Sequence, residues 1–74
     1  MGEEEADFPD SSNIRSGKWI PERKVIEIVY NGGGRYAYSD CTESEWDRIC
    51  EAMSTGKAVN RILKESGKSF VKVS

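Results

Sequence analysis

The sequence predicts a small α+β domain in which an antiparallel β-sheet packs against two helices. Residues 24–30 are rich in β-branched and aromatic side chains, which favours a strand. The Asn-Gly-Gly-Gly segment at 31–34 predicts a tight hairpin directly after that strand. A helix-capping motif at 42–45 then precedes apolar residues at helical spacing. The 74 residues leave room for one domain.

The strand at 24–30 is the clearest element of the predicted sheet. Ile26, Ile28 and Tyr30 recur at period two, so they share one face of that strand. Asparagine and glycine accept the positive φ angles of tight turns, so the chain should reverse at 31–34.

Three further strands are expected. An irregular first strand is expected at 12–19, with Ile14 pointing inward, although Gly17 weakens this prediction. The hairpin should return through residues 35–39, and residues 69–73 alternate as a short final strand would. The predicted order is therefore β-β-β-α-α with a short last strand.

The first helix has a strong start signal. Thr42 and Glu45 form a capping box, in which each side chain bonds the other residue's backbone N–H. Behind it, apolar residues at positions i, i+3, i+4 and i+7 form one stripe: Trp46, Ile49, Cys50 and Met53.

The second helix is expected at about 55–65. Val59, Ile62 and Leu63 would form its buried face. Gly67 stands where a glycine commonly ends a helix.

The charge is distributed unevenly along the chain. The net charge is −2, with 13 acidic and 11 basic residues. Five of the acids lie within residues 1–10, which contain no base; they are Glu3, Glu4, Glu5, Asp7 and Asp10. Residues 11–74 contain the other eight acids and all 11 bases, so they carry a net charge of +3. We therefore predict a disordered acidic tail at 1–10 and a single, mildly basic domain at 11–74.

The composition argues against catalysis and against a bound metal. The chain has two cysteines, Cys41 and Cys50, and no histidine, so neither thiol has the usual partner base or a zinc ligand set. Cys50 is expected to be buried on the apolar stripe and Cys41 to be more exposed. We expect no enzyme activity, no catalytic residues, no metal and no cofactor. A cytoplasmic location with reduced thiols and no membrane association is the corresponding expectation.

One surface pattern suggests binding. Lys57, Arg61, Lys64 and Lys68 recur at i, i+4, i+7 and i+11, which places four cations on one side of the second helix. Such a stripe serves either as a solubilising face or as a contact for a nucleic-acid backbone, with Arg35 as a further cation.

Taken together, these segments resemble the KTSC family, small bacterial domains named for the C-terminus of some lysyl-tRNA synthetases. The similarity covers residues 11 to about 73. It rests on the order and spacing of Ser12-Asn13-Ile14, Trp19, Ile26-x-Ile28-x-Tyr30, Tyr36-Ala37-Tyr38, Ala52-x-Ser54-x-Gly56, Asn60 and Ile62. The resemblance implies a stand-alone module or an appendage of bacterial or phage origin, with RNA as the expected ligand. Val59 departs from it, since the family tends to have an aromatic residue there.

The family-like motifs have structural explanations too. Tyr36 and Tyr38 share a face, which would be either part of the core or a platform on which bases stack. Ser54, Gly56 and Asn60 are expected to be structural.

Two functions therefore remain open from the sequence. The first is a non-catalytic module that contacts RNA or another nucleic acid through the basic second helix. The second is a protein-interaction module that docks through a sheet edge or the region of Trp19. The sequence leaves the oligomeric state open.

Overall fold

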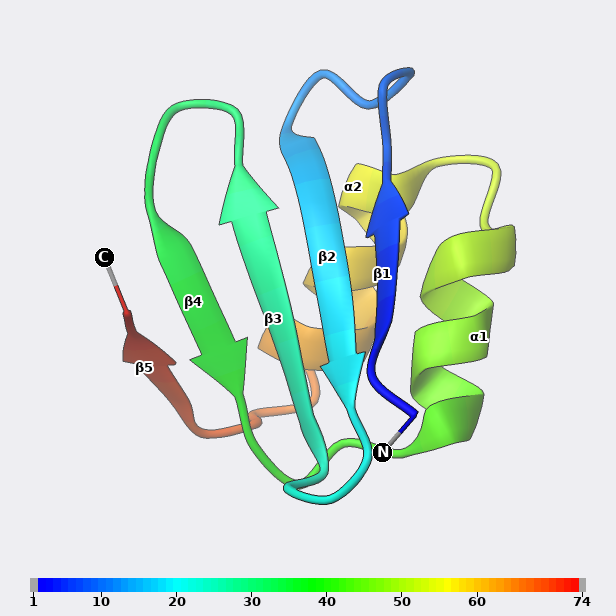
Figure 1. Cartoon of the computed structure of the whole chain (residues 1–74). Helices are drawn as coiled ribbons and strands as arrows, with labels where there is room; N and C mark the ends of the chain where they lie inside the picture. Colours follow the sequence, from blue (N-terminus) through cyan, green and yellow to red (C-terminus); the bar gives the residue numbers. More distant parts are fainter. Residues whose placement is uncertain (1, 74) are drawn as a thin grey trace.

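The protein is a five-stranded antiparallel sheet with its helices packed on one face (Figure 1). This computed structural model describes residues 2–73. The elements in chain order are β1 (Glu4–Asp7), β2 (Ile14–Ile20), β3 (Val25–Tyr30), β4 (Arg35–Tyr38), α1 (Glu43–Glu51), α2 (Thr55–Val59), the π-helical turn η1 (Asn60–Lys64) and β5 (Phe70–Lys72). The predicted α+β class is confirmed.

The strands lie in the order β1-β2-β3-β4-β5, so each pairs with its neighbour in sequence. Residue Ile28 stands opposite Tyr36, and Ile26 opposite both Trp19 and Tyr38. Because directly opposed residues point to the same face, the predicted apolar face of β3 continues across the sheet.

The hairpin between β3 and β4 forms as predicted. The Tyr30 N–H donates to Gly34 O (3.1 Å), and the Gly33 N–H donates to Tyr30 O (3.0 Å). Gly33 and Gly34 have φ angles of 96° and 100°, which side chains with a Cβ rarely adopt.

The prediction of a disordered acidic tail is wrong for residues 4–7, which form β1. This strand pairs with β2, with Ala6 opposite Gly17. Phe8 follows it and joins the core with 9% of its surface exposed. The Trp46 indole N–H donates to a Glu4 carboxylate oxygen at 3.0 Å. The density of charge in this segment hides a strand pattern, in which the apolar Ala6 and Phe8 alternate with the acids Glu5 and Asp7.

Trp46 occupies the centre of the core, where α1 crosses the sheet. The predicted capping box is confirmed: the Glu45 N–H donates to Thr42 Oγ1 (3.2 Å), and the Thr42 N–H donates to Glu45 Oε1 (2.9 Å). Trp46 is 1% exposed. A Cβ at Gly17 would lie 3.1 Å from Trp46 Cζ3, so the missing side chain lets the indole lie directly on β2.

The expected positions of the two cysteines are reversed. Helix α1 ends at Glu51, so Met53 leaves the predicted stripe and is fully exposed, and Cys50 is also exposed. Cys41 is completely buried, and its thiol donates to Tyr38 O at 3.2 Å. The connection from β4 to α1 passes under the end of the sheet, where Cys41 N–H donates to Lys24 O at 2.8 Å.

We expect only one thiol to react in the folded protein. Burial raises the pKa of the Cys41 thiol, and partial burial together with the charge of Asp47 raises the pKa of Cys50. The thiolate is the reactive form, so labelling by a disulfide reagent should accelerate as the pH rises. Cys50 should react in buffer and Cys41 only in denaturant. A fast phase that persists in Cys50→Ser and disappears in Cys41→Ser would contradict this assignment.

The second helix is not uniformly α-helical. It begins as α2 with Ser54 as its N-cap and widens into η1, where the Glu65 N–H donates to Asn60 O (2.8 Å), five residues back. The predicted buried residues are confirmed: Val59, Ile62 and Leu63 are 1%, 8% and 0% exposed.

The helical segment is followed by the predicted last strand. Gly67 has a φ of 78°, as expected for a glycine at a helix end. Strand β5 pairs with β4, with Val71 opposite Ala37. Among residues 2–73, no helix is long and apolar enough to cross a membrane.

Candidate functional site

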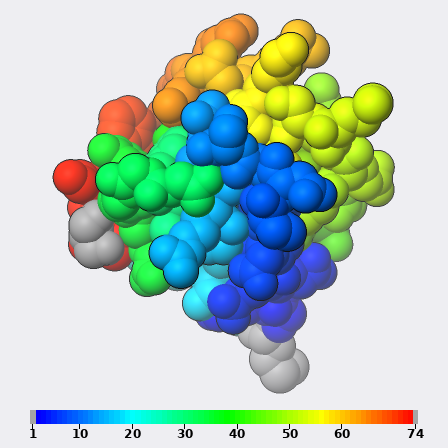
Figure 2. Space-filling view, turned by 90° about the horizontal axis from the view of Figure 1, so that it is seen from above, coloured from blue at the N-terminus to red at the C-terminus, as the bar shows by residue number. Residues whose placement is uncertain are grey.

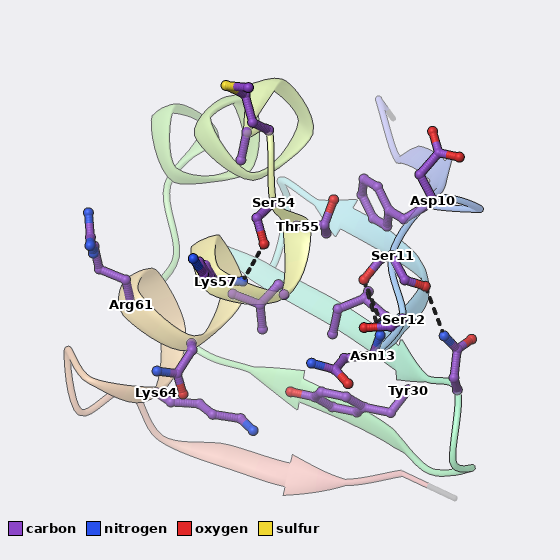
Figure 3. Close-up of a pocket in the computed structure, with 18 of the residues that line it drawn as sticks. Asp10, Ser11, Ser12, Asn13, Tyr30, Ser54, Thr55, Lys57, Arg61 and Lys64 are labelled. Carbon is purple, nitrogen blue, oxygen red and sulfur yellow. Dashed lines mark hydrogen bonds between the residues drawn. The ribbon is translucent and has the colours of Figure 1, made fainter.

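Three of the predicted cations line one open hollow on the surface. Lys57 lies on α2, Arg61 and Lys64 lie on η1, and all three side chains are exposed. The hollow has a volume of about 990 Å³ (Figure 3). We call it the polar hollow; it is lined by residues 7–14, 30–32, 52–57 and 59–61, with Lys64 and Glu65.

The other two predicted cations lie elsewhere. Lys68 follows the chain reversal at Gly67, and its amine contacts Glu45 Oε2 (3.2 Å) and Asp40 O (2.9 Å). This side chain is 15% exposed, so it supports the start of α1 and does not continue the basic stripe. Arg35 is exposed at the start of β4 but does not line the polar hollow.

The two walls of the polar hollow carry opposite charges. The helical wall carries three cations, Lys57, Arg61 and Lys64, and one acid, Glu65, whereas the wall formed by the segment after β1 carries Asp7 and Asp10. Figure 3 shows Asp10 and Arg61 on opposite sides of the hollow. Figure 2 shows the two walls side by side, with the segment after β1 in blue and the helical wall in yellow and orange.

Hydrogen bonds fix the loop that leads into β2. Ser11 Oγ accepts from the N–H groups of Asn13 (3.3 Å) and Ile14 (3.0 Å). The Asn31 N–H donates to Asn13 O (2.9 Å), and its side-chain amide donates to Ser11 O (3.1 Å). The backbone of Asn13 is therefore held in place, while its side chain faces the hollow (Figure 3).

The three family-like residues of the second helix surround the same hollow. The Ser54 hydroxyl accepts from the Lys57 N–H (3.4 Å) and so caps α2. Gly56 lies against Asn13, because a Cβ there would be 3.3 Å from Asn13 Nδ2. The Asn60 amide donates to a Glu65 carboxylate oxygen at 2.9 Å.

An aromatic groove lies next to the polar hollow. The groove has a volume of about 560 Å³ and is lined by Tyr30, Gly33, Tyr36, Tyr38, Lys64, Lys68 and Phe70. It thus contains all three tyrosines of the chain and one of its two phenylalanines. The rings contact one another at centroid distances of 5.5 Å for Tyr30–Tyr36 and 5.7 Å for Tyr36–Phe70.

The two motif tyrosines differ in burial. Tyr38 is 3% exposed and belongs to the core, whereas Tyr36 is half-buried and forms part of the groove wall. The Tyr30 and Tyr38 hydroxyls form a 2.7 Å hydrogen bond. Burial, followed by this hydrogen bond, raises the pKa of Tyr30, so the groove stays uncharged there well above neutral pH.

Tyr30 and Lys64 connect the two depressions, since both residues line the polar hollow and the aromatic groove. The Lys64 amine lies 5.1 Å from the centroid of the Tyr30 ring, a cation–π distance. A ligand that passes this pair therefore meets a cluster of aromatic rings on one side and cations on the other.

The described residues contain no group of three or more cysteine, aspartate and glutamate side chains placed to hold a metal ion. The chemistry that the two depressions offer is hydrogen bonding, positive charge and ring stacking.

Comparison with known proteins identifies the family. The family model of the KTSC domain matches residues 10–66. The chain belongs to the KTSC domain family. A curated protein of Tsukamurella paurometabola is 31% identical over 55 residues, which cover 74% of this chain and 82% of that protein. A protein of Stutzerimonas stutzeri is 30% identical over 54 residues, which cover 73% and 76% of the two chains.

A solved KTSC domain structure has the same fold. The crystal structure of a KTSC domain protein from Yersinia pestis superposes with a TM-score of 0.87 at 22% sequence identity. The match covers 99% of this chain and all of the other. The family-model match begins at residue 10, so it leaves out β1.

Sequence reasoning assigned no binding role to Asn13, Tyr30 or Phe70, which line the two depressions. In the sequence, Asn13 is marked only by its place in the family-like Ser12-Asn13-Ile14 motif, and Tyr30 only by its place on the apolar face of its strand. Phe70 was visible through the alternation of the last strand, but its contact with Tyr36 depends on the pairing of β5 with β4.

Proposed function

We propose that this KTSC domain is a non-catalytic module that binds single-stranded RNA across the aromatic groove and the helical wall of the polar hollow. The observation that carries the proposal is the junction at Tyr30 and Lys64, where a cluster of aromatic rings in edge-to-face and tilted contact meets a row of cations. Proteins that bind single strands combine these two features, because bases stack on rings while cations follow the phosphates.

The charges on the surface support one path for the strand. Lys57, Arg61 and Lys64 form a row along the helical wall, where phosphates would be attracted. Asp7 and Asp10 on the facing wall repel phosphates. The groove supplies Phe70, which is 58% exposed, as a ring that a base can reach.

The salt dependence of binding tests the proposal. Three phosphate contacts at about −0.7 each predict a log–log salt slope of about −2 for a labelled oligoribonucleotide measured by fluorescence anisotropy. The double variant Lys57→Glu/Arg61→Glu should bind about tenfold or more weakly with a smaller slope. The matched control is Arg23→Glu/Arg48→Glu, which alters net charge equally at exposed positions outside both depressions. Unchanged melting curves should show that both variants stay folded.

The aromatic part of the site is tested separately. Phe70→Ala removes one stacking surface and should weaken binding by about fivefold or more without changing the salt slope, because stacking releases no counterions. No binding at low salt, or equal losses in the two charge-reversal variants, would disprove the proposal.

One observation favours a protein-interaction module as the second candidate. Three of the exposed large apolar residues lie together at the sheet edge: Phe70, Val71 and Val73, at 58%, 65% and 50% exposure. An exposed apolar edge strand is a template for pairing with a further strand. The Trp19 side chain, by contrast, is not available for docking, since it is 5% exposed and packs in the core.

A further inference from the structure

We propose that Asn13 reads the identity of a base in the polar hollow and favours adenine over uracil. The inference rests on the proposed RNA-binding function and adds a specificity-determining residue to it. It follows from three properties of the hollow: a side-chain amide without a partner, the space that Gly56 leaves for that amide, and the opposite charges of the two walls.

The amide of Asn13 differs from those of the other asparagines in the hollow. The Asn60 amide donates to Glu65 (2.9 Å), and the Asn31 amide donates to Ser11 O (3.1 Å). The Asn13 amide makes no hydrogen bond within residues 2–73, so it keeps both a donor and an acceptor for a ligand. An asparagine amide pairs with adenine in a bidentate manner through N6 and N7.

Gly56 determines where this amide lies. The Asn13 backbone is fixed by its bonds to Ser11 and Asn31, and its side chain extends toward α2. A Cβ at position 56 would lie 3.3 Å from Nδ2 and 3.7 Å from Cβ of Asn13, so a larger residue would crowd the amide. The amide therefore lines the hollow and stays open to a ligand, at the contact between two distant segments of the chain.

The wall charges orient a bound nucleotide. Phosphates are attracted to the wall of Lys57 and Arg61, which turns the base toward Asn13 and the wall of Asp7 and Asp10. Carboxylates accept hydrogen bonds from exocyclic amino groups. Adenine has such a group beside its N7 acceptor, whereas uracil has a single N3–H donor between two carbonyl oxygens, which the carboxylates repel.

The test uses the full chain and labelled hexaribonucleotides in anisotropy titrations at low salt. The probes are a uridine hexamer, the same hexamer with one adenosine placed at each position in turn, and one with purine riboside, which stacks but lacks the amino group. In the unmodified protein, adenosine at the best position should tighten binding by about fivefold or more over uridine. Purine riboside should lose most of that gain.

Two variants assign the effect to the amide. Asn13→Ala should reduce the adenosine preference to less than about twofold while binding of the uridine hexamer changes little. Asn60→Ala, the matched control in the same hollow, should keep the preference because its amide is already bonded to Glu65. A third variant, Gly56→Ala, should weaken the preference by displacing Asn13.

The outcomes separate this inference from the proposed function. Binding of all hexamers with no adenosine preference, or with a preference that survives Asn13→Ala, would overturn the base-reading role and leave RNA binding intact. A preference lost equally in Asn13→Ala and Asn60→Ala would also overturn it. No binding of any hexamer by the unmodified protein would overturn both proposals.

Discussion

Trp46→Ala should destabilise the protein by about 3–5 kcal/mol, the range for removing a large buried aromatic side chain. Trp46 is 1% exposed and fills the space between α1 and the glycine at position 17 of β2. Small domains are only marginally stable, so a loss of this size approaches the whole free energy of unfolding. The measurement is urea denaturation followed by circular dichroism, in which the midpoint should move far toward zero urea.

Two controls make the Trp46 result specific. Met53→Ala removes another large side chain from the same region of the chain, but Met53 is fully exposed, so stability should change by less than about 0.5 kcal/mol. Trp46→Phe keeps a ring and loses the indole N–H bond to Glu4, so it should cost less than the alanine variant. A Trp46→Ala protein of near-normal stability would mean that α1 packs through a different face.

Phe8→Ala should cost about 3 kcal/mol, near the lower end of the range because the ring is 9% exposed. This corresponds to a melting temperature lower by more than about 10 °C for a domain of this size. Deleting residues 2–8 should cost more, since it also removes the pairing of β1 with β2 and the Glu4–Trp46 hydrogen bond.

Glu5→Ala is the matched control for the first strand. Glu5 lies in β1 but is exposed, so its loss should change stability by less than about 0.5 kcal/mol. A deletion of residues 2–8 that leaves the thermal midpoint unchanged would show that β1 does not contribute to the fold. Differential scanning calorimetry of the three variants measures all of these differences.

Local signals were sufficient to predict most of the elements. The alternation in β3, the glycines of the following turn and the capping box at Thr42 are read within a few neighbouring residues. In each case the physical cause is also local: side-chain direction, allowed φ angles or a hydrogen bond three residues away. For the same reason, the helical spacing of Lys57, Arg61 and Lys64 placed these three cations on one wall of the polar hollow.

Features that depend on distant partners were not predictable in this way. Phe8 is buried only because other core elements pack beside it. The Lys68 side chain is drawn away from the basic stripe by its contacts with Glu45 and with the backbone oxygen of Asp40, more than twenty positions earlier in the sequence. The reversed burial of the cysteines follows from where α1 stops and from the path of its connection under the sheet.

The sequence by itself determined the fold class, the family, the β3–β4 hairpin, the capped helix and the basic spacing of the second helix. Only the tertiary structure decided that the acidic segment contains a strand, that Tyr30 and Lys64 join the polar hollow to the aromatic groove, and that Asn13 lies against Gly56. The reason is that strand pairing and side-chain packing bring together residues far apart in the chain, and their mutual contacts leave no periodic trace in either segment.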